Sequence, residues 1–176
     1  MTGRRFGLSI GIALVVLFAV FWIGATIWFF GDENPDWLQD REWVADAEAR
    51  CAQARGELDR LPQARDLRDL EDTDDQADKL ADRANQIEAS TAVLAVMTAD
   101  LAASAPDGND GELVGLWLGT WETYLNDRLD HAEALRAGED RQFRVSVERG
   151  EGVDALLDAF ADRNRMPSCG DPLDIG

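Results

Sequence analysis

The sequence contains two cysteines, Cys51 and Cys169, and the distance between them restricts the chemistry that they can carry out. They lie too far apart for a Cys-x-x-Cys redox motif, and no histidine is near either of them, so a metal or redox pair fits poorly. If both lie in an oxidising compartment, as argued below, a structural disulfide is favoured. In the chain-entropy model, closing so long a loop gives on the order of 4 to 5 kcal/mol of stability. The bridge would tie the C-terminal tail to the segment that carries Cys51.

The single histidine, His131, follows Asp127 by one helical turn, a spacing that could hold a metal ion. Two ligands do not complete a site, and the sequence offers no further ligands that can be assigned to it. We therefore predict that this pair is a surface contact or an incidental feature of the helix, and no metal site. One histidine is also a poor basis for general acid–base catalysis.

Acidic residues are dense between positions 63 and 79, which raises the question of a calcium site. An EF-hand loop that began at Asp72 would need glycine at its sixth position and glutamate at its twelfth. Ala77 and Arg83 occupy those two positions, so the match fails. We predict a solvated loop or the start of a helix in this segment.

Sequence motifs for covalent or cofactor chemistry are missing. The chain has no nucleophile elbow, no histidine-based zinc motif and no phosphate-binding loop. Carboxylate pairs arise by chance among 35 acidic residues, so they do not indicate an active site. The sequence predicts no catalytic residue, no cofactor-binding residue and no cofactor, and we do not expect an enzyme.

An uncharged apolar run at residues 6–30 decides where the rest of the chain is placed. At a rise of about 1.5 Å per residue, a helix of this length crosses a hydrocarbon core of about 30 Å with some tilt. The run is too long for the apolar region of a cleaved signal peptide. We predict an uncleaved transmembrane signal anchor, whose first partner is the lipid bilayer.

The charges on the two sides of this run predict its direction. Arg4 and Arg5 precede it, whereas acidic residues follow it from Asp32 onward, and the basic flank stays in the cytoplasm. The expected segments are a cytoplasmic stub at 1–5, the anchor at 6–30, a linker at 31–35 and an extracytoplasmic domain at 36–176. That domain must fold close to the membrane surface because the linker is short.

Inside the apolar run, Gly7 and Gly11 form a Gly-x-x-x-Gly pair. This spacing lets two transmembrane helices approach closely, so a helix–helix contact in the bilayer is one interpretation. Glycine is common in membrane helices, and the alternative is that the pair has no partner. The sequence leaves both open.

The charge of the chain limits its partners. All 35 acidic residues follow position 31, and the formal net charge of the chain is −18. Such a field opposes nucleic acid and anionic lipid head groups, and it favours cations or basic partners. The simpler interpretation is that the charge keeps an exported domain soluble. Nucleic acid is not expected as a partner in either case.

Apolar residues recur at three-four spacing in four stretches after the anchor, which predicts four amphipathic helices. The first is expected to run from Pro35, with Asn34 as its N-cap, to Leu61, and Asp40 interrupts its apolar stripe. The other three are expected at residues 77–101, 111–137 and 153–164. We predict an all-α fold, an antiparallel bundle of three long helices and a short fourth, behind the single transmembrane helix.

The third of these helices carries Trp117, Trp121 and Tyr124 at helical spacing. An aromatic stripe of this kind is more often core than ligand pocket, and a pocket is kept as the alternative. Gly115 and Gly119 lie four residues apart among large side chains. They would allow another helix to approach closely, which would offset their low helix propensity.

Two connecting segments have local signals of their own. Residues 106–111 form a turn by composition, in which Asn109 or Asp110 is expected to cap the third helix. Residues 141–148 alternate apolar and polar side chains, which fits either a short strand or a packed connector. The sequence does not decide between these two.

The last third of the chain contains two distinctive segments, Trp121-x-x-Tyr124-Leu125-x-Asp127-Arg128 and Phe160-Ala161-x-x-Asn164-x-Met166-Pro167-Ser168-Cys169. With the single anchor and the acidic helical domain, they resemble small actinobacterial membrane proteins of unknown function that carry a C-terminal Met-Pro-Ser-Cys ending. The resemblance implies a localisation and an architecture. It brings no catalytic residues with it.

These observations favour a membrane-anchored, extracytoplasmic interaction or scaffold protein of the bacterial cell envelope, with a protein partner in the membrane or envelope. The alternative is an extracytoplasmic domain that binds a small ligand or acts as a sensor. A sensor of this kind would have to signal through a partner, because only five residues are expected in the cytoplasm.

Overall fold

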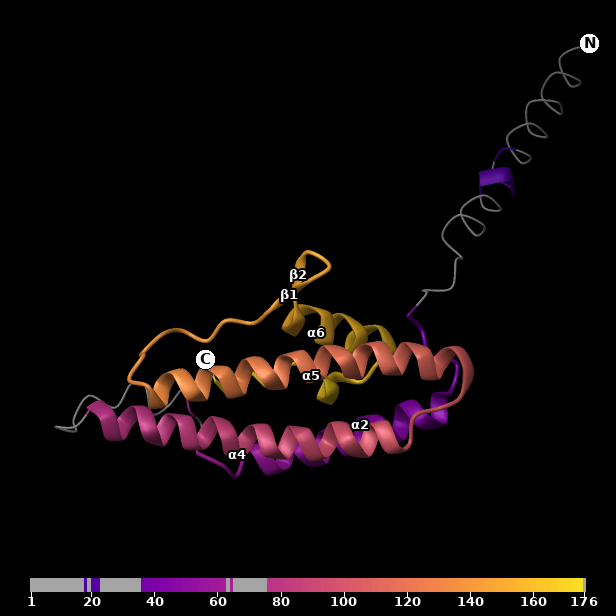
Figure 1. Cartoon of the computed structure of the whole chain (residues 1–176). Helices are drawn as coiled ribbons and strands as arrows, with labels where there is room; N and C mark the ends of the chain where they lie inside the picture. The colour runs from indigo at the N-terminus through magenta and orange to yellow at the C-terminus, as the bar shows by residue number, and fades with distance from the viewer. Residues whose placement is uncertain (1–17, 19, 23–35, 63, 65–75, 176) are drawn as a thin grey trace, which may run out of the picture. The chain divides into compact units, whose positions relative to one another are not determined.

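The computed structural model describes residues 18, 20–22, 36–62, 64 and 76–175 (Figure 1). The chain divides into two compact units, Met1–Trp37 and Leu38–Gly176, and the account below concerns the second unit by itself. The predicted anchor at 6–30 lies almost wholly outside the described residues, as do Gly7, Gly11 and most of the acidic segment 63–79. Within the described residues, no helix has both the length and the apolar character needed to span a bilayer. The anchor therefore stays a prediction.

The second unit is built from antiparallel helices. They are α2 (Arg41–Leu58), α4 (Gln76–Ala103), α5 (Gly108–Arg136) and the shorter α6 (Val153–Asn164). In Figure 1, α4 and α5 lie side by side and run in opposite directions. Helix α2 packs against α4, and α6 packs against α5. The all-α fold and the helical bundle are confirmed.

Helix α2 begins later than predicted. Asp40 does not interrupt the helix but is its N-cap, because its carboxylate accepts a hydrogen bond from the Trp43 backbone N at 2.9 Å. The predicted N-cap and first residue, 34–35, lie outside the described residues. The residue Leu38 is fully buried, and its backbone N donates to Asn164 Oδ1 at 2.9 Å. The contact between Leu38 and Asn164 therefore keeps the chain before residue 40 out of the helix, although local propensity predicts that the helix begins earlier.

The predicted cap of α5 is also wrong. Asp107 holds the N-cap position of this helix, without a capping hydrogen bond from its side chain, and neither Asn109 nor Asp110 does so. Asp110 instead accepts hydrogen bonds from the backbone N atoms of Gln39 and Asp40, at 2.8 and 2.7 Å. Its carboxylate thus fastens the start of α2 to the start of α5.

One apolar cluster fills the centre of the bundle, and every helix contributes to it. Its largest members are Leu38, Trp43, Leu58, Leu94, Met97, Leu101, Trp117, Trp121, Tyr124, Leu157, Phe160 and Met166. Gly115 and Gly119 lie outside this cluster on α5, and a Cβ added to either would meet nothing within 4 Å. The predicted close approach of a second helix at these glycines is wrong, because no described atom packs against either of them.

A connector at residues 137–146 links α5 to a small hairpin. The strands of the hairpin are β1 (Val147–Glu148) and β2 (Glu151–Gly152), which pair antiparallel with Val147 opposite Gly152. Phe143 and Val145 of the connector pack against the core cluster. The segment 141–148 is therefore a packed connector for most of its length and a strand only in its last two residues.

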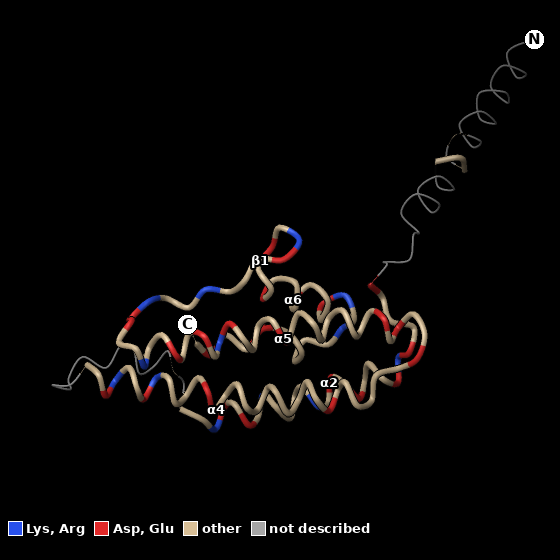
Figure 2. The backbone as a smooth tube through the Cα atoms, in the orientation of Figure 1, with Lys and Arg blue, Asp and Glu red and all other residues tan. Residues whose placement is uncertain are grey.

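Acidic residues occur along all four helices rather than at one end of the bundle (Figure 2). Basic residues are interspersed with them on the same helices. The bundle therefore carries its negative charge over much of its surface.

Candidate functional site

The C-terminal tail, residues 165–175, contacts most of the other elements. It starts with Arg165, whose φ of 62° is in the left-handed region and turns the chain out of α6. The Met166 backbone N then donates to Ala161 O at 2.8 Å, which closes the helix end. The 3-10 helix η1 (Pro167–Cys169) follows and packs against both α2 and α6. The predicted stop of the helix before this tail is confirmed.

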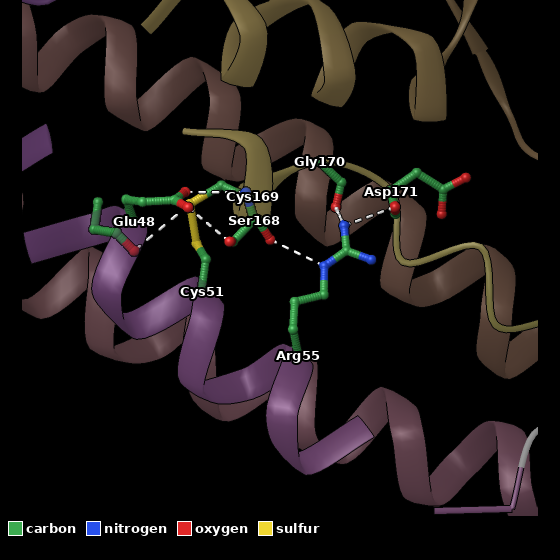
Figure 3. The surroundings of a disulfide bond; sticks show 8 residues. Glu48, Cys51, Arg55, Ser168, Cys169, Gly170 and Asp171 are labelled. Atoms are coloured by element: carbon green, nitrogen blue, oxygen red, sulfur yellow. Dashed lines mark hydrogen bonds between the residues drawn. A yellow bond between two sulfur atoms is a disulfide. The ribbon is translucent and has the colours of Figure 1, made fainter. Parts of the chain in front are cut away.

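Cys51 of α2 and Cys169 of η1 form the predicted disulfide (Figure 3). Both residues are completely buried, and both belong to the central apolar cluster. Cys51 lies on the face of α2 that points into the bundle. The disulfide is therefore part of the core, and the tail enters the core with it.

Two charged side chains on the same face of α2 hold the tail on either side of the disulfide (Figure 3). The carboxylate of Glu48 accepts hydrogen bonds from Ser168 N at 3.0 Å and Ser168 Oγ at 2.6 Å. The guanidinium of Arg55 donates to three tail carbonyl oxygens, those of Ser168, Gly170 and Asp171, at 2.7 to 3.0 Å. A short tail without a strand or helix partner thus has its backbone groups satisfied by α2.

The other end of the tail is held by a buried ion pair. Arg128 of α5 is completely buried and makes a bidentate contact with Asp174, with both N···O distances at 2.7 Å. The same guanidinium donates to Ser90 Oγ at 2.6 Å and Thr91 Oγ1 at 2.9 Å. Both hydroxyls in turn donate to the carbonyl oxygen of Ile87. The ion pair therefore links α4, α5 and the tail.

The electrostatics of this pair follow from its burial. Burial by itself raises the pKa of Asp174, but the hydrogen bonds and charge of Arg128 outweigh it and hold the pKa below its ordinary value. Burial likewise acts to lower the pKa of Arg128, and the contacts with Asp174 reverse that effect. Both side chains are charged at neutral pH, so removing one would leave the other buried without a counter-charge.

Tyr124 connects the two ends of the tail. Its hydroxyl donates to Asp171 Oδ1 at 2.6 Å and accepts a longer bond of 3.4 Å from Arg128. Burial raises the pKa of Tyr124 well above its ordinary value, so the hydroxyl keeps its proton. Asp158 of α6 completes the arrangement by accepting a hydrogen bond from the Asp171 backbone N at 2.8 Å.

The aromatic stripe of α5 lies in the core. Trp117 stacks on Phe160 with ring centroids 5.0 Å apart, and Trp121 meets Trp117 and Tyr124 edge to face. Neither tryptophan lines a described cavity, whereas Tyr124 borders a groove of about 560 Å³. The other residues that line this groove are Phe143, Arg144, Val145, Asp154, Asp171, Leu173 and Ile175. Trp117 and Trp121 are therefore core residues, and of the three aromatic residues Tyr124 alone borders a described groove.

Asp127 and His131 do not act as a pair. Both oxygens of Asp127 accept hydrogen bonds from Ser146, one from its backbone N at 2.6 Å and one from its Oγ at 2.7 Å. The carboxylate thus positions the connector before β1. No cluster of three or more metal-ligating side chains occurs within the residues that the structure describes.

His131 is buried, so the predicted surface contact is wrong for this residue. Its ring packs against Phe143 with centroids 5.5 Å apart, and its Nε2 has no hydrogen-bond partner among the described residues. Burial, together with the nearby charges of Arg83 and Arg141, lowers the pKa of His131 to about 4. The imidazole is therefore neutral at physiological pH.

His131 lies beside a cleft of about 440 Å³ between the end of α5 and the connector that follows it. The cleft is lined by Asp127, Asp130, His131, Arg141, Gln142 and Arg144. Its lining is polar throughout, in contrast to the aromatic stripe. The sequence singled out two members of this set, but not the arginines that face them.

Sequence reasoning also missed the buried ion pair. One signal was available for Arg128, because it continues the buried stripe of Trp117, Trp121 and Tyr124 at helical spacing. A charged residue at such a position requires a buried partner. No comparable signal marked Asp174, which lies in a segment without periodicity.

Comparisons with other proteins give no match to this chain among family models, curated proteins or solved structures. Its function is therefore argued from its own sequence and geometry.

Proposed function

We propose that this chain is a membrane-anchored, extracytoplasmic interaction or scaffold protein of the bacterial cell envelope. The observation that carries the proposal is the Cys51–Cys169 disulfide in the core of the bundle. Structural disulfides form and persist in oxidising compartments and are rare in the cytosol. The charges on either side of the apolar run at 6–30 independently predict that the bundle is extracytoplasmic.

The position of the apolar run supports the same topology. The run precedes Leu38, the residue at which the chain enters the bundle. An uncleaved anchor with Arg4 and Arg5 on its cytoplasmic side would hold the bundle outside the membrane.

The surface of the bundle supports a role in protein contacts. Several large apolar side chains are exposed on it, among them Val96 of α4 and Leu116 of α5, at 65% and 66%. Along the same helices, Asp100 follows Val96 by four residues and Glu112 precedes Leu116 by four. A partner with basic and apolar side chains would complement such a surface.

Topology is tested on the full-length protein in its native host. Free thiols are blocked with an alkylating agent during lysis, and the peptides containing Cys51 and Cys169 are then analysed by mass spectrometry. The proposal predicts a disulfide-linked peptide pair from the membrane fraction, and release of the protein from that fraction when residues 1–30 are removed. Two alkylated cysteines, or a full-length protein found outside the membrane fraction, would contradict the proposed location.

The interaction role is tested by crosslinking in cells. A photo-reactive amino acid is placed at Leu116 or at Val96, and at Glu133 as a matched exposed position on the charged surface of α5. The proposal predicts a discrete light-dependent adduct from at least one of the two apolar positions. No adduct from any position, with a protein of normal abundance and location, would count against an interaction protein.

A second candidate function is a small-ligand-binding domain that signals through a partner. The tryptophans at which the sequence allowed a pocket are packed in the core, so they do not favour it. The observation in its favour is the polar cleft beside His131.

A further inference from the structure

The cleft beside His131 has the size of a small-molecule site. Its volume of about 440 Å³ falls within the range of roughly 300 to 1,000 Å³ that is typical of ligand pockets. It is formed by the last turns of α5 and by the connector, which Figure 1 shows in orange leaving the end of that helix. Unlike the groove beside the tail, it is lined only by polar and charged side chains.

Two arginines of this cleft are available for an anionic group. Arg144 makes no hydrogen bond or ion pair within the described part of the chain. Arg141 has one contact, in which its Nε lies 3.9 Å from Glu139 and both side chains are more than half exposed. A contact of this length and exposure is weak. Arginine binds carboxylates through a bidentate pair of hydrogen bonds, so these two side chains can receive one.

The two acidic residues of the cleft differ in their availability. Asp127 is occupied, because Ser146 donates to both of its oxygens. Asp130 is exposed and accepts no hydrogen bond within the described residues. Two aspartates and two arginines make the formal charge of the lining zero. A dianion would be repelled by the aspartates, whereas a ligand with one carboxylate and one ammonium group matches the lining.

His131 lines this cleft, and its Nε2 is buried without a hydrogen-bond partner among the described residues. Only 3% of the residue is exposed, and its ring makes no hydrogen bond within the described residues. Because the ring is neutral at physiological pH, it adds no charge to the lining of the cleft.

We propose that this cleft binds a small zwitterion of the amino-acid class. Arg141 and Arg144 receive its carboxylate, Asp130 receives its ammonium group, and the buried ring of His131 lines the site. The inference does not depend on the membrane anchor or on the scaffold role. It adds a ligand site to either of the functions considered above.

The test is isothermal titration calorimetry on the full-length protein in detergent, with the common L-amino acids as probes. We expect saturable one-to-one binding of at least one of them. Succinate, which has carboxylates but no ammonium group, and ethylamine, which has the reverse, serve as matched probes and should bind much more weakly. No heat of binding from any amino acid would overturn the proposal.

Variants of exposed residues locate the site without affecting the fold. Arg144→Gln and Asp130→Asn should each weaken amino-acid binding by roughly 10- to 100-fold, the range for loss of charge-assisted hydrogen bonds. Arg60→Gln, an exposed arginine outside the cleft, should leave the affinity unchanged. Equal affinity for succinate and an amino acid, or unchanged affinity in Arg144→Gln, would overturn the proposed zwitterion site.

Discussion

Two neighbouring regions near the end of α5 contain arginines and are built in opposite ways. At the tail, Arg128 is completely buried and donates to Asp174, Ser90 and Thr91. At the cleft, His131 follows one turn further along α5 and Arg144 comes from the connector, and neither side chain makes a hydrogen bond within the described residues. The first region resembles the interior of a folded protein, in which buried polar groups are paired. In the second, Arg144 and Asp130 make no side-chain hydrogen bond within the described residues, which contributes little to folding and leaves them available to a ligand.

The largest expected effect comes from breaking the buried ion pair. Arg128→Ala should lower the free energy of unfolding by about 3 to 5 kcal/mol, because it leaves the Asp174 carboxylate buried and unpaired. Arg144→Ala, the matched change in the cleft, should alter it by no more than about 0.5 kcal/mol. Urea unfolding of the two variants measures both values.

A double variant sharpens this prediction. Arg128→Met combined with Asp174→Asn removes both charges and should recover a large part of the lost stability, because the penalty comes mainly from the unpaired partner. An effect of Arg128→Ala no larger than that of Arg144→Ala would contradict the distinction between the two regions.

Removal of the disulfide should have the next largest effect. Cys51→Ser with Cys169→Ser opens a loop of 118 residues and should lower the free energy of unfolding by about 2 to 5 kcal/mol. The folded structure should persist, because Glu48, Arg55 and the buried ion pair still hold the tail. Loss of helical circular dichroism signal in the double serine variant at low temperature would show that these contacts are insufficient.

The pH dependence of stability should report on the cleft. The folded pKa of His131 is about 4 and its ordinary value is 6.5, so the unfolded chain takes up the proton first. The free energy of unfolding should therefore fall as the pH is lowered from 6.5 to about 4. Asp174 acts at lower pH, because its contribution is present above 3.8 and is lost as the pH falls through its lowered folded value.

His131→Gln isolates the histidine part of this dependence. The difference in stability between this variant and the natural protein should change between pH 6.5 and 4 and be constant above that window. Equal slopes for the two proteins across the window would mean that His131 keeps its ordinary pKa and is not enclosed as described.

The smallest expected effect is at the hydroxyl that joins the two ends of the tail. Tyr124→Phe removes the hydrogen bond to Asp171 while keeping the ring in the core, and should cost about 1 to 2 kcal/mol. Thermal unfolding of this variant, compared with the natural protein at the same pH, gives the value. A change below the experimental error would make the bond to Asp171 irrelevant to the attachment of the tail.

The sequence predicted those features that depend on periodicity or on rare residue types. The three-four spacing of apolar residues placed the helices, and the two cysteines could be paired because there were no others. Helix ends were less predictable, because Asp40 and Asp110 interact with segments that are distant in sequence. Local propensity carries no information about such contacts.

The buried ion pair and the cleft could not be predicted from the periodicity of the sequence, for a related reason. Arg128 is one of sixteen arginines, and its partner Asp174 lies in a tail without regular structure. The arginines of the cleft belong to the connector after α5, whose path is set by Asp127 and by the packing of Phe143. These sites arise when an irregular segment folds back on a helix, and only the folded chain brings their residues together.

The central claim is that the C-terminal tail is part of the core and not an appendage secured by its disulfide. The most direct measurement is urea unfolding of a chain that ends at Gly170, so that Cys51 and Cys169 remain bonded while Asp171 to Gly176 are removed. We predict a loss of at least about 3 to 5 kcal/mol, the value for breaking a buried ion pair, with the disulfide intact. A truncated chain that unfolds at the same urea concentration as the full-length protein would contradict the claim.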